Sequence, residues 1–129
     1  MKTKLNYFFG ATSVVAIILS IYAFNKPAAG SQEFLQVTAV ESVVPGGLGR
    51  SRLITIGEGG KMDEVKMENF FSMVGINFEN IRMNDKTITE KISYLTSQGW
   101  ELKFISTGVY AADKSTGIFI TRYTFAKQK

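Results

Sequence analysis

The longest apolar run of the sequence lies near its start. No charged residue occurs from Leu5 to Asn25, and Lys2 and Lys4 precede the run. As a helix, residues 5–24 would be about 30 Å long, which matches the hydrocarbon thickness of a bilayer. The run is therefore typical of an export signal or a membrane anchor. A helix buried inside the folded domain is the alternative interpretation, and it would need covering on every side.

The residues around this run predict where the rest of the chain is located. Because the lysines lie mainly before the run, the positive-inside rule places the N-terminus in the cytoplasm and the domain outside it. Ala28, Ala29 and Gly30 supply the small residues that cleavage of a signal peptide requires. We therefore divide the chain into a signal peptide or membrane anchor with its linker, residues 1–30, and one domain, residues 31–129. We expect that domain to be exported across the inner membrane, and to be periplasmic, secreted or anchored in that membrane.

Alternating and β-branched residues predict three strands in the first half of the domain. Leu35, Val37 and Ala39 alternate with polar residues, which is typical of a half-buried strand. The run Pro45-Gly46-Gly47-Leu48-Gly49 ends this strand, and Glu58-Gly59-Gly60-Lys61 predicts a turn between the next two. The expected strands are residues 34–44, 52–56 and 62–67, and residues 68–74 are expected to be a short helical or irregular segment.

A helix is predicted over residues 87–98. Thr87 and Glu90 have the spacing of a capping box, and Gly99 follows where a left-handed residue often ends a helix. An apolar stripe at spacings of four and three supports the helix, and the Asn84-Asp85 pair is expected to separate it from the residues before it. The stripe consists of Ile88, Ile92 and Leu95.

Two more strands are predicted after the helix. Trp100, Leu102 and Phe104 alternate with charged residues, so they are expected on one buried face, with Trp100 as the anchor of the core. Residues 107–116 are expected to be a loop, and residues 117–125 a final strand whose apolar start suits the interior of a sheet. The fold class is therefore α+β: an antiparallel sheet of four to five strands with one main helix packed on a face, preceded by an N-terminal apolar helix.

The run Gln98-Gly99-Trp100-Glu101-Leu102, between a helix and an aromatic strand, resembles a small bacterial domain family of unknown function. Its members are similar to this chain in an opening strand like Phe34-Leu35-Gln36-Val37 and in a closing strand like residues 118–125. The resemblance spans residues 34–127 and is loose between residues 46 and 85, where the chain is similar to an exported subgroup. It implies the same fold, and it implies no activity, cofactor or catalytic residue.

The composition excludes most familiar active-site chemistry. Without cysteine or histidine, the chain has no disulfide, no thiol or imidazole nucleophile and none of the usual nitrogen and sulfur zinc ligands. Fifteen Lys and Arg stand against eleven Asp and Glu, but Lys2, Lys4 and Lys26 flank the apolar run, so the domain itself is nearly neutral. We therefore expect no nucleic-acid partner, no metal and no cofactor.

The loop from Gly46 to Arg52 is a candidate anion site. Its glycines allow backbone N–H groups to approach a phosphate, and Arg50 and Arg52 offer bidentate donors on one side of an extended segment. The loop lacks the lysine and the following helix of a P-loop. A turn that joins two paired strands is the favoured interpretation. Arg50 and Arg52 remain the candidate ligand-binding residues.

Four acidic residues lie close together in the sequence and offer carboxylate oxygens. Such a group suits a hard cation such as calcium, or the carboxylate pair of a hydrolase. Two interspersed lysines and the lack of an EF-hand spacing favour a solvated hairpin instead. The four residues are Glu58, Asp63, Glu64 and Glu68.

Residues 62–78 form an apolar stretch that is rich in methionine. Methionine adapts to irregular partners, so Phe71 and Met73 are candidate partner-binding residues. For the stretch as a whole, the favoured interpretation is that its side chains fill the core beneath a long connecting segment.

Three functions are compatible with these patterns. The leading hypothesis is a non-enzymatic envelope module that binds a protein or another envelope component and contacts the membrane through residues 5–24 if these are not cleaved. The alternative is a domain that binds a small ligand or anion through the loop from Gly46 to Arg52. The third is a hydrolase that uses carboxylates.

Overall fold

The computed structural model describes residues 30–111, 113–114 and 116–129. The apolar helix predicted over residues 5–24 and the predicted cleavage residues Ala28 and Ala29 lie outside this part of the chain. Among the residues that the structure does describe, no helix is both long and apolar enough to cross a membrane.

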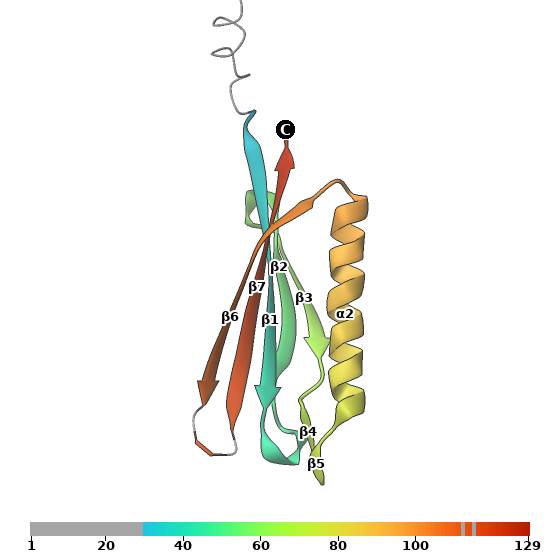
Figure 1. The fold of residues 1–129 in the computed structure, drawn as a ribbon, viewed down its shortest axis with the longest axis vertical. Helices are drawn as coiled ribbons and strands as arrows, with labels where there is room; N and C mark the ends of the chain where they lie inside the picture. Colours follow the sequence, from blue (N-terminus) through green and yellow to red (C-terminus); the bar gives the residue numbers. More distant parts are fainter. Residues whose placement is uncertain (1–29, 112, 115) are drawn as a thin grey trace, which may run out of the picture. The chain divides into compact units, whose positions relative to one another are not determined.

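Five antiparallel strands form one sheet (Figure 1). They are β1 (Gln32–Val43), β2 (Ser51–Ile56), β3 (Met62–Met67), β6 (Glu101–Ala111) and β7 (Gly117–Gln128). Their order across the sheet is β3-β2-β1-β7-β6, so β3 and β6 are the two edges. β7 lies between β1 and β6, which confirms the interior position that its apolar start predicted. The predicted α+β class and the antiparallel sheet are therefore confirmed.

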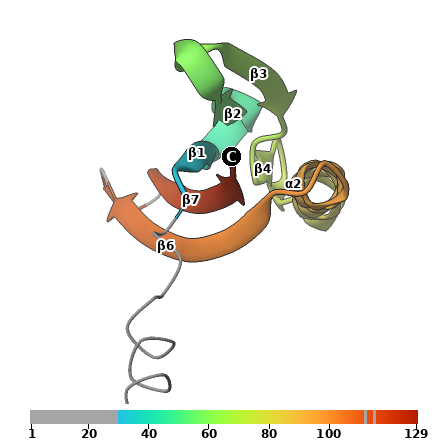
Figure 2. The same cartoon turned by 90° about the horizontal axis from the view of Figure 1, so that it is seen from above.

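One main helix, α2 (Phe78–Ser97), lies on the concave face of this sheet (Figure 2). It begins nine residues before the predicted start, because Asn77 caps it: the Asn77 side chain accepts hydrogen bonds from the backbone N–H groups of Glu79 and Asn80. The predicted capping box at Thr87 is wrong, since the Thr87 hydroxyl donates to the carbonyl oxygen of Met83 inside the helix.

The end of α2 follows the prediction. Gly99 has a φ of +83°, which glycine adopts without the steric strain that a Cβ atom would cause, and the helix ends just before it. The predicted break at Asn84-Asp85 is wrong, because α2 runs through it. Asn84 is fully buried there, and its side chain bonds both the N–H and the carbonyl oxygen of Glu68.

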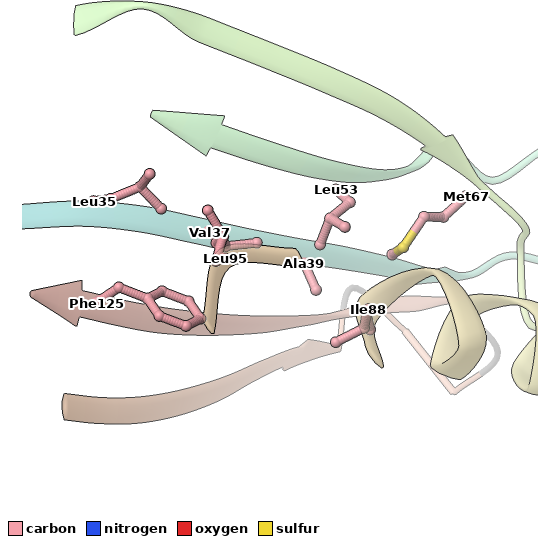
Figure 3. Packing of buried hydrophobic residues seen from close by; sticks show 8 residues of the cluster. All are labelled: Leu35, Val37, Ala39, Leu53, Met67, Ile88, Leu95 and Phe125. Atoms are coloured by element: carbon pink, nitrogen blue, oxygen red, sulfur yellow. The ribbon is translucent and has the colours of Figure 1, made fainter. Parts of the chain in front are cut away.

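The hydrophobic core lies between α2 and the concave face of the sheet. Alternate residues of β1 and β2 point into it, as the alternation in β1 predicted, and two residues of α2 cover them. Trp100 is only partly buried but packs against the same cluster. The buried residues of the cluster are Leu35, Val37, Ala39, Leu53, Met67, Ile88, Leu95 and Phe125 (Figure 3).

β6 is longer and more exposed than its sequence predicted. The expected loop over residues 107–116 is wrong for its first half, because pairing with β7 continues to Ala111. A register shift between Leu102 and Phe104 places these two side chains on opposite faces of the sheet. Leu102 packs against the core, whereas Phe104 is 69% exposed, so the expected shared buried face is also wrong.

The segment between β3 and α2 is irregular, as predicted, and contains the short hairpin of β4 (Phe71–Ser72) and β5 (Gly75–Ile76). Most of the methionine-rich stretch does not fill the core: of its large apolar side chains, only Met67 belongs to the buried cluster. The exposed ones are Met62, Val65, Met73, Val74, Ile76 and Phe78.

Candidate functional site

The β6 edge of the sheet is long and apolar. Within the described residues, β7 is the only strand that pairs with β6. From Phe104 to Ala111 the strand carries no charge. Phe104 and Tyr110 lie on one face of the sheet, Ile105 and Val109 lie on the other, and all four side chains are more than half exposed. Natural edge strands are usually protected by charges, proline or a covering element, because their free N–H and C=O groups pair with other strands.

A hollow of about 220 Å³ lies at the C-terminal end of β6. Val109 of β6, Phe119 of β7 and Phe71 of β4 line it, and its wall is mainly apolar. The ring of Phe119 also lies 5.9 Å from the ring of Phe70, measured between centroids. Because side chains of neighbouring strands lie beside one another, a residue of a strand paired with β6 would lie next to this hollow.

The two predicted partner-binding residues lie in different surroundings. Phe71 is half-buried and contributes to the hollow at the end of β6. Met73 lies in the turn between β4 and β5, is 86% exposed and does not line the hollow. The structure therefore brings Phe71, and not Met73, to the apolar edge.

Residues of the predicted anion-binding loop contact other parts of the protein. Arg52 lies in β2, where its Nε is 2.5 Å from a carboxylate oxygen of Glu64 on β3, so a cross-strand ion pair uses its charge. Arg50 precedes β2 and is exposed. Gly49 lies so close to the side chains of Asn69 and Ser42 that a Cβ atom would collide with them. Packing thus requires this glycine, whether or not an anion approaches the loop.

Ion pairs also engage Asp63 and Glu64 among the predicted acidic residues whose side chains the structure describes, and the side chain of Glu58 lies outside that part. Asp63 lies 2.9 Å from Nζ of Lys91 on α2, and this hydrogen-bonded ammonium lowers the pKa of the Asp63 carboxyl. Glu64 pairs with Arg52, and Glu68 is exposed. In the part of the chain that the structure describes, no three acidic side chains are grouped so that they could hold one metal ion.

A different carboxyl, which the sequence analysis did not single out, has a perturbed environment. Burial raises the pKa of Glu41 on β1, although a hydrogen bond from Asn84 Nδ2 at 3.3 Å partly opposes the shift. Burial also raises the pKa of Tyr123 on β7, and the nearby charges of Glu41 and Asp85 raise it further. The alternation that puts Leu35, Val37 and Ala39 on one face of β1 also puts Glu41 on that face, so a period of two could have identified it, whereas its partner Asn84 comes from distant α2.

Replacing Glu41 with glutamine should make the domain more stable at neutral pH. Because its pKa is raised in the folded state, the Glu41 carboxyl binds protons more tightly there than in the unfolded chain. The contribution of Glu41 to the free energy of unfolding therefore falls as pH rises from the ordinary value of 4.5 through the raised one. Glutamine still accepts the Asn84 hydrogen bond but does not ionise, so Glu41→Gln should remove this decline. Urea unfolding at a series of pH values checks the result, and an unchanged pH dependence would contradict it.

The family resemblance rests on residues that lie at one corner of the fold. Gly99 ends α2, Trp100 packs partly against the core and β6 begins at Glu101. These contacts explain the local sequence by packing and do not add a functional group. No family model, no curated protein and no solved structure matches this chain.

Proposed function

We propose that this protein is a non-catalytic binding module of the cell envelope, and that it binds an extended segment of another protein as an added strand along β6. The apolar run of residues 5–24 with its flanking lysines supports delivery across the inner membrane. The observation that carries the binding proposal is the uncharged edge from Phe104 to Ala111, whose outer side no described strand pairs with.

The chemistry of this edge identifies the kind of occupant. The free backbone groups of an edge strand are best satisfied by the backbone of another extended chain, which gives affinity through main-chain hydrogen bonds. The exposed side chains on both faces favour a segment with apolar residues and little charge. The hollow beside Val109 and Phe71 offers a place for one apolar side chain of the segment, and this gives specificity.

Photo-crosslinking from the edge tests the proposal in cells that make the full chain. With p-benzoylphenylalanine in place of Val109, irradiation should produce one main adduct, and mass spectrometry should place the crosslink in a short apolar segment of a partner protein. Adding Ile105→Lys should lower the adduct yield by at least about tenfold, because a charge would then have to be buried in the interface.

Met73→Lys is the matched control, since Met73 is also an exposed apolar residue, at 86%, but does not belong to β6. It should leave the adduct yield unchanged. The proposal fails if no adduct forms at residue 109, if Met73→Lys and not Ile105→Lys abolishes it, or if the only adduct joins two copies of this chain.

A further inference from the structure

A second, larger cleft lies between the C-terminal half of α2 and the β2–β3 hairpin. Its volume is about 520 Å³, which is within the range of sites for small molecules. The side chains of Leu35 and Leu95 form an apolar part of its wall, and Tyr94 and Trp100 add two aromatic rings. Tyr94 is 60% exposed, so its ring is accessible from solvent.

Three lysines and one aspartate line the same cleft, which gives it a net positive charge. Lys61 comes from the β2–β3 turn, Lys91 from α2 and Lys127 from β7. Lys91 uses one donor on Asp63, and Lys127 uses one on the carbonyl oxygen of Gln98 at 2.8 Å. Because an ammonium group has three N–H donors, both side chains keep donors for a ligand.

A buried hydroxyl in the wall of the cleft is also without a partner. Thr55 on β2 is 8% exposed, and its Oγ1 is hydrogen-bonded to no described residue. A buried hydroxyl without a hydrogen bond is unfavourable. Because Thr55 Oγ1 is itself covered, the hydrogen-bond donors that a ligand in the cleft can reach are those of the lysines.

From these features we infer that the cleft binds a small organic anion that carries an anionic head group and an apolar or aromatic body. The two positive charges that Asp63 does not balance suit a doubly charged head such as a phosphomonoester. The body would lie against the exposed ring of Tyr94, since ring faces pack well against apolar groups. Nζ of Lys127 lies over the Trp100 ring, 6.0 Å from its centroid, so Trp100 helps to position this lysine. This site is separate from β6 and does not depend on the binding of a protein segment there.

Calorimetric titration of the full chain in a non-ionic detergent tests the inference, with phenyl phosphate as the probe. We expect one phenyl phosphate per chain, and weaker binding of inorganic phosphate because it lacks the ring. Lys61→Met with Lys127→Met should weaken the binding of phenyl phosphate by at least about tenfold, through the loss of charge-assisted hydrogen bonds. Methionine keeps much of the apolar stem that each lysine packs with.

The matched control removes the same charge elsewhere, through Lys66→Met with Lys86→Met, neither of which lines the cleft. It should change the affinity by less than about twofold. Lys61→Met alone, at an exposed turn residue, serves if the double variant does not fold. Absence of phenyl phosphate binding, equal weakening by the control, or equal affinity for inorganic phosphate would overturn the inference.

Discussion

Replacing Phe125 with alanine should lower the free energy of unfolding by about 3–5 kcal/mol, as for other large aromatic truncations in cores. Phe125 is the largest fully buried side chain that the structure describes, and it lies in β7 between Leu35 of β1 and Leu102 of β6. Because a domain of this size has about 5–15 kcal/mol of stability, this loss is a large fraction of the total. Urea unfolding followed by the fluorescence of Trp100, the single tryptophan, measures the loss.

Phe104→Ala is the control for this prediction. Phe104 lies in the neighbouring strand but is 69% exposed, so its removal should change the free energy of unfolding by less than about 1 kcal/mol. A loss below about 1 kcal/mol for Phe125→Ala, or equal losses for the two variants, would show that the core is not where this account places it.

Asn69→Ala should cost roughly 3 kcal/mol, because buried backbone and hydroxyl groups would lose their partners. The Asn69 side chain is buried and makes four hydrogen bonds. Its Oδ1 accepts from the Val44 N–H and the Ser42 hydroxyl, and its Nδ2 donates to the carbonyl oxygens of Val44 and Phe71. These bonds join the end of β1 to the segment that carries Phe71.

Asn80→Ala provides the comparison for Asn69→Ala. The Asn80 side chain donates one hydrogen bond, to the carbonyl oxygen of Asn69 at 2.7 Å, and it is only partly buried. Its loss should cost about 1 kcal/mol. If thermal unfolding shows that Asn69→Ala costs no more than Asn80→Ala, the Asn69 network does not hold the segment in place.

Local sequence signals predicted the parts of the fold that neighbouring residues determine. The alternation in β1, the glycine turn of the β2–β3 hairpin and the end of α2 at Gly99 are of this kind, and all three are present. The continuation of α2 through Asn84-Asp85 and the length of β6 depend on distant residues, whereas the start of α2 follows a local cap, Asn77, that the sequence contains. The backbone of Glu68 forms hydrogen bonds with the side chain of Asn84, so Asn84 can lie inside the helix. Residues 106–108 are Ser, Thr and Gly, whose sequence suggests a loop, but β7 pairs with them.

The candidate sites could be predicted only in part, because their residues are far apart in the sequence and come together only in the fold. Phe71 was identifiable as an apolar residue in a methionine-rich stretch, but its neighbour across the hollow, Val109, belongs to the unrecognised half of β6. Lys61, Lys91 and Lys127 are spread along the chain, and only the packing of α2 on the sheet brings them to one cleft. No spacing in the sequence marks them as a group.

Amide hydrogen exchange along β6 tests the strand-addition proposal most directly. The measurement compares the full chain alone with the full chain bound to a synthetic peptide of the crosslinked partner segment. The account predicts that β6 amides not bonded to β7 exchange rapidly in the free protein and at least about tenfold more slowly in the complex, while amides of the opposite edge, β3, do not change. Unchanged exchange along residues 104–111, with slowing confined to another surface, would contradict it.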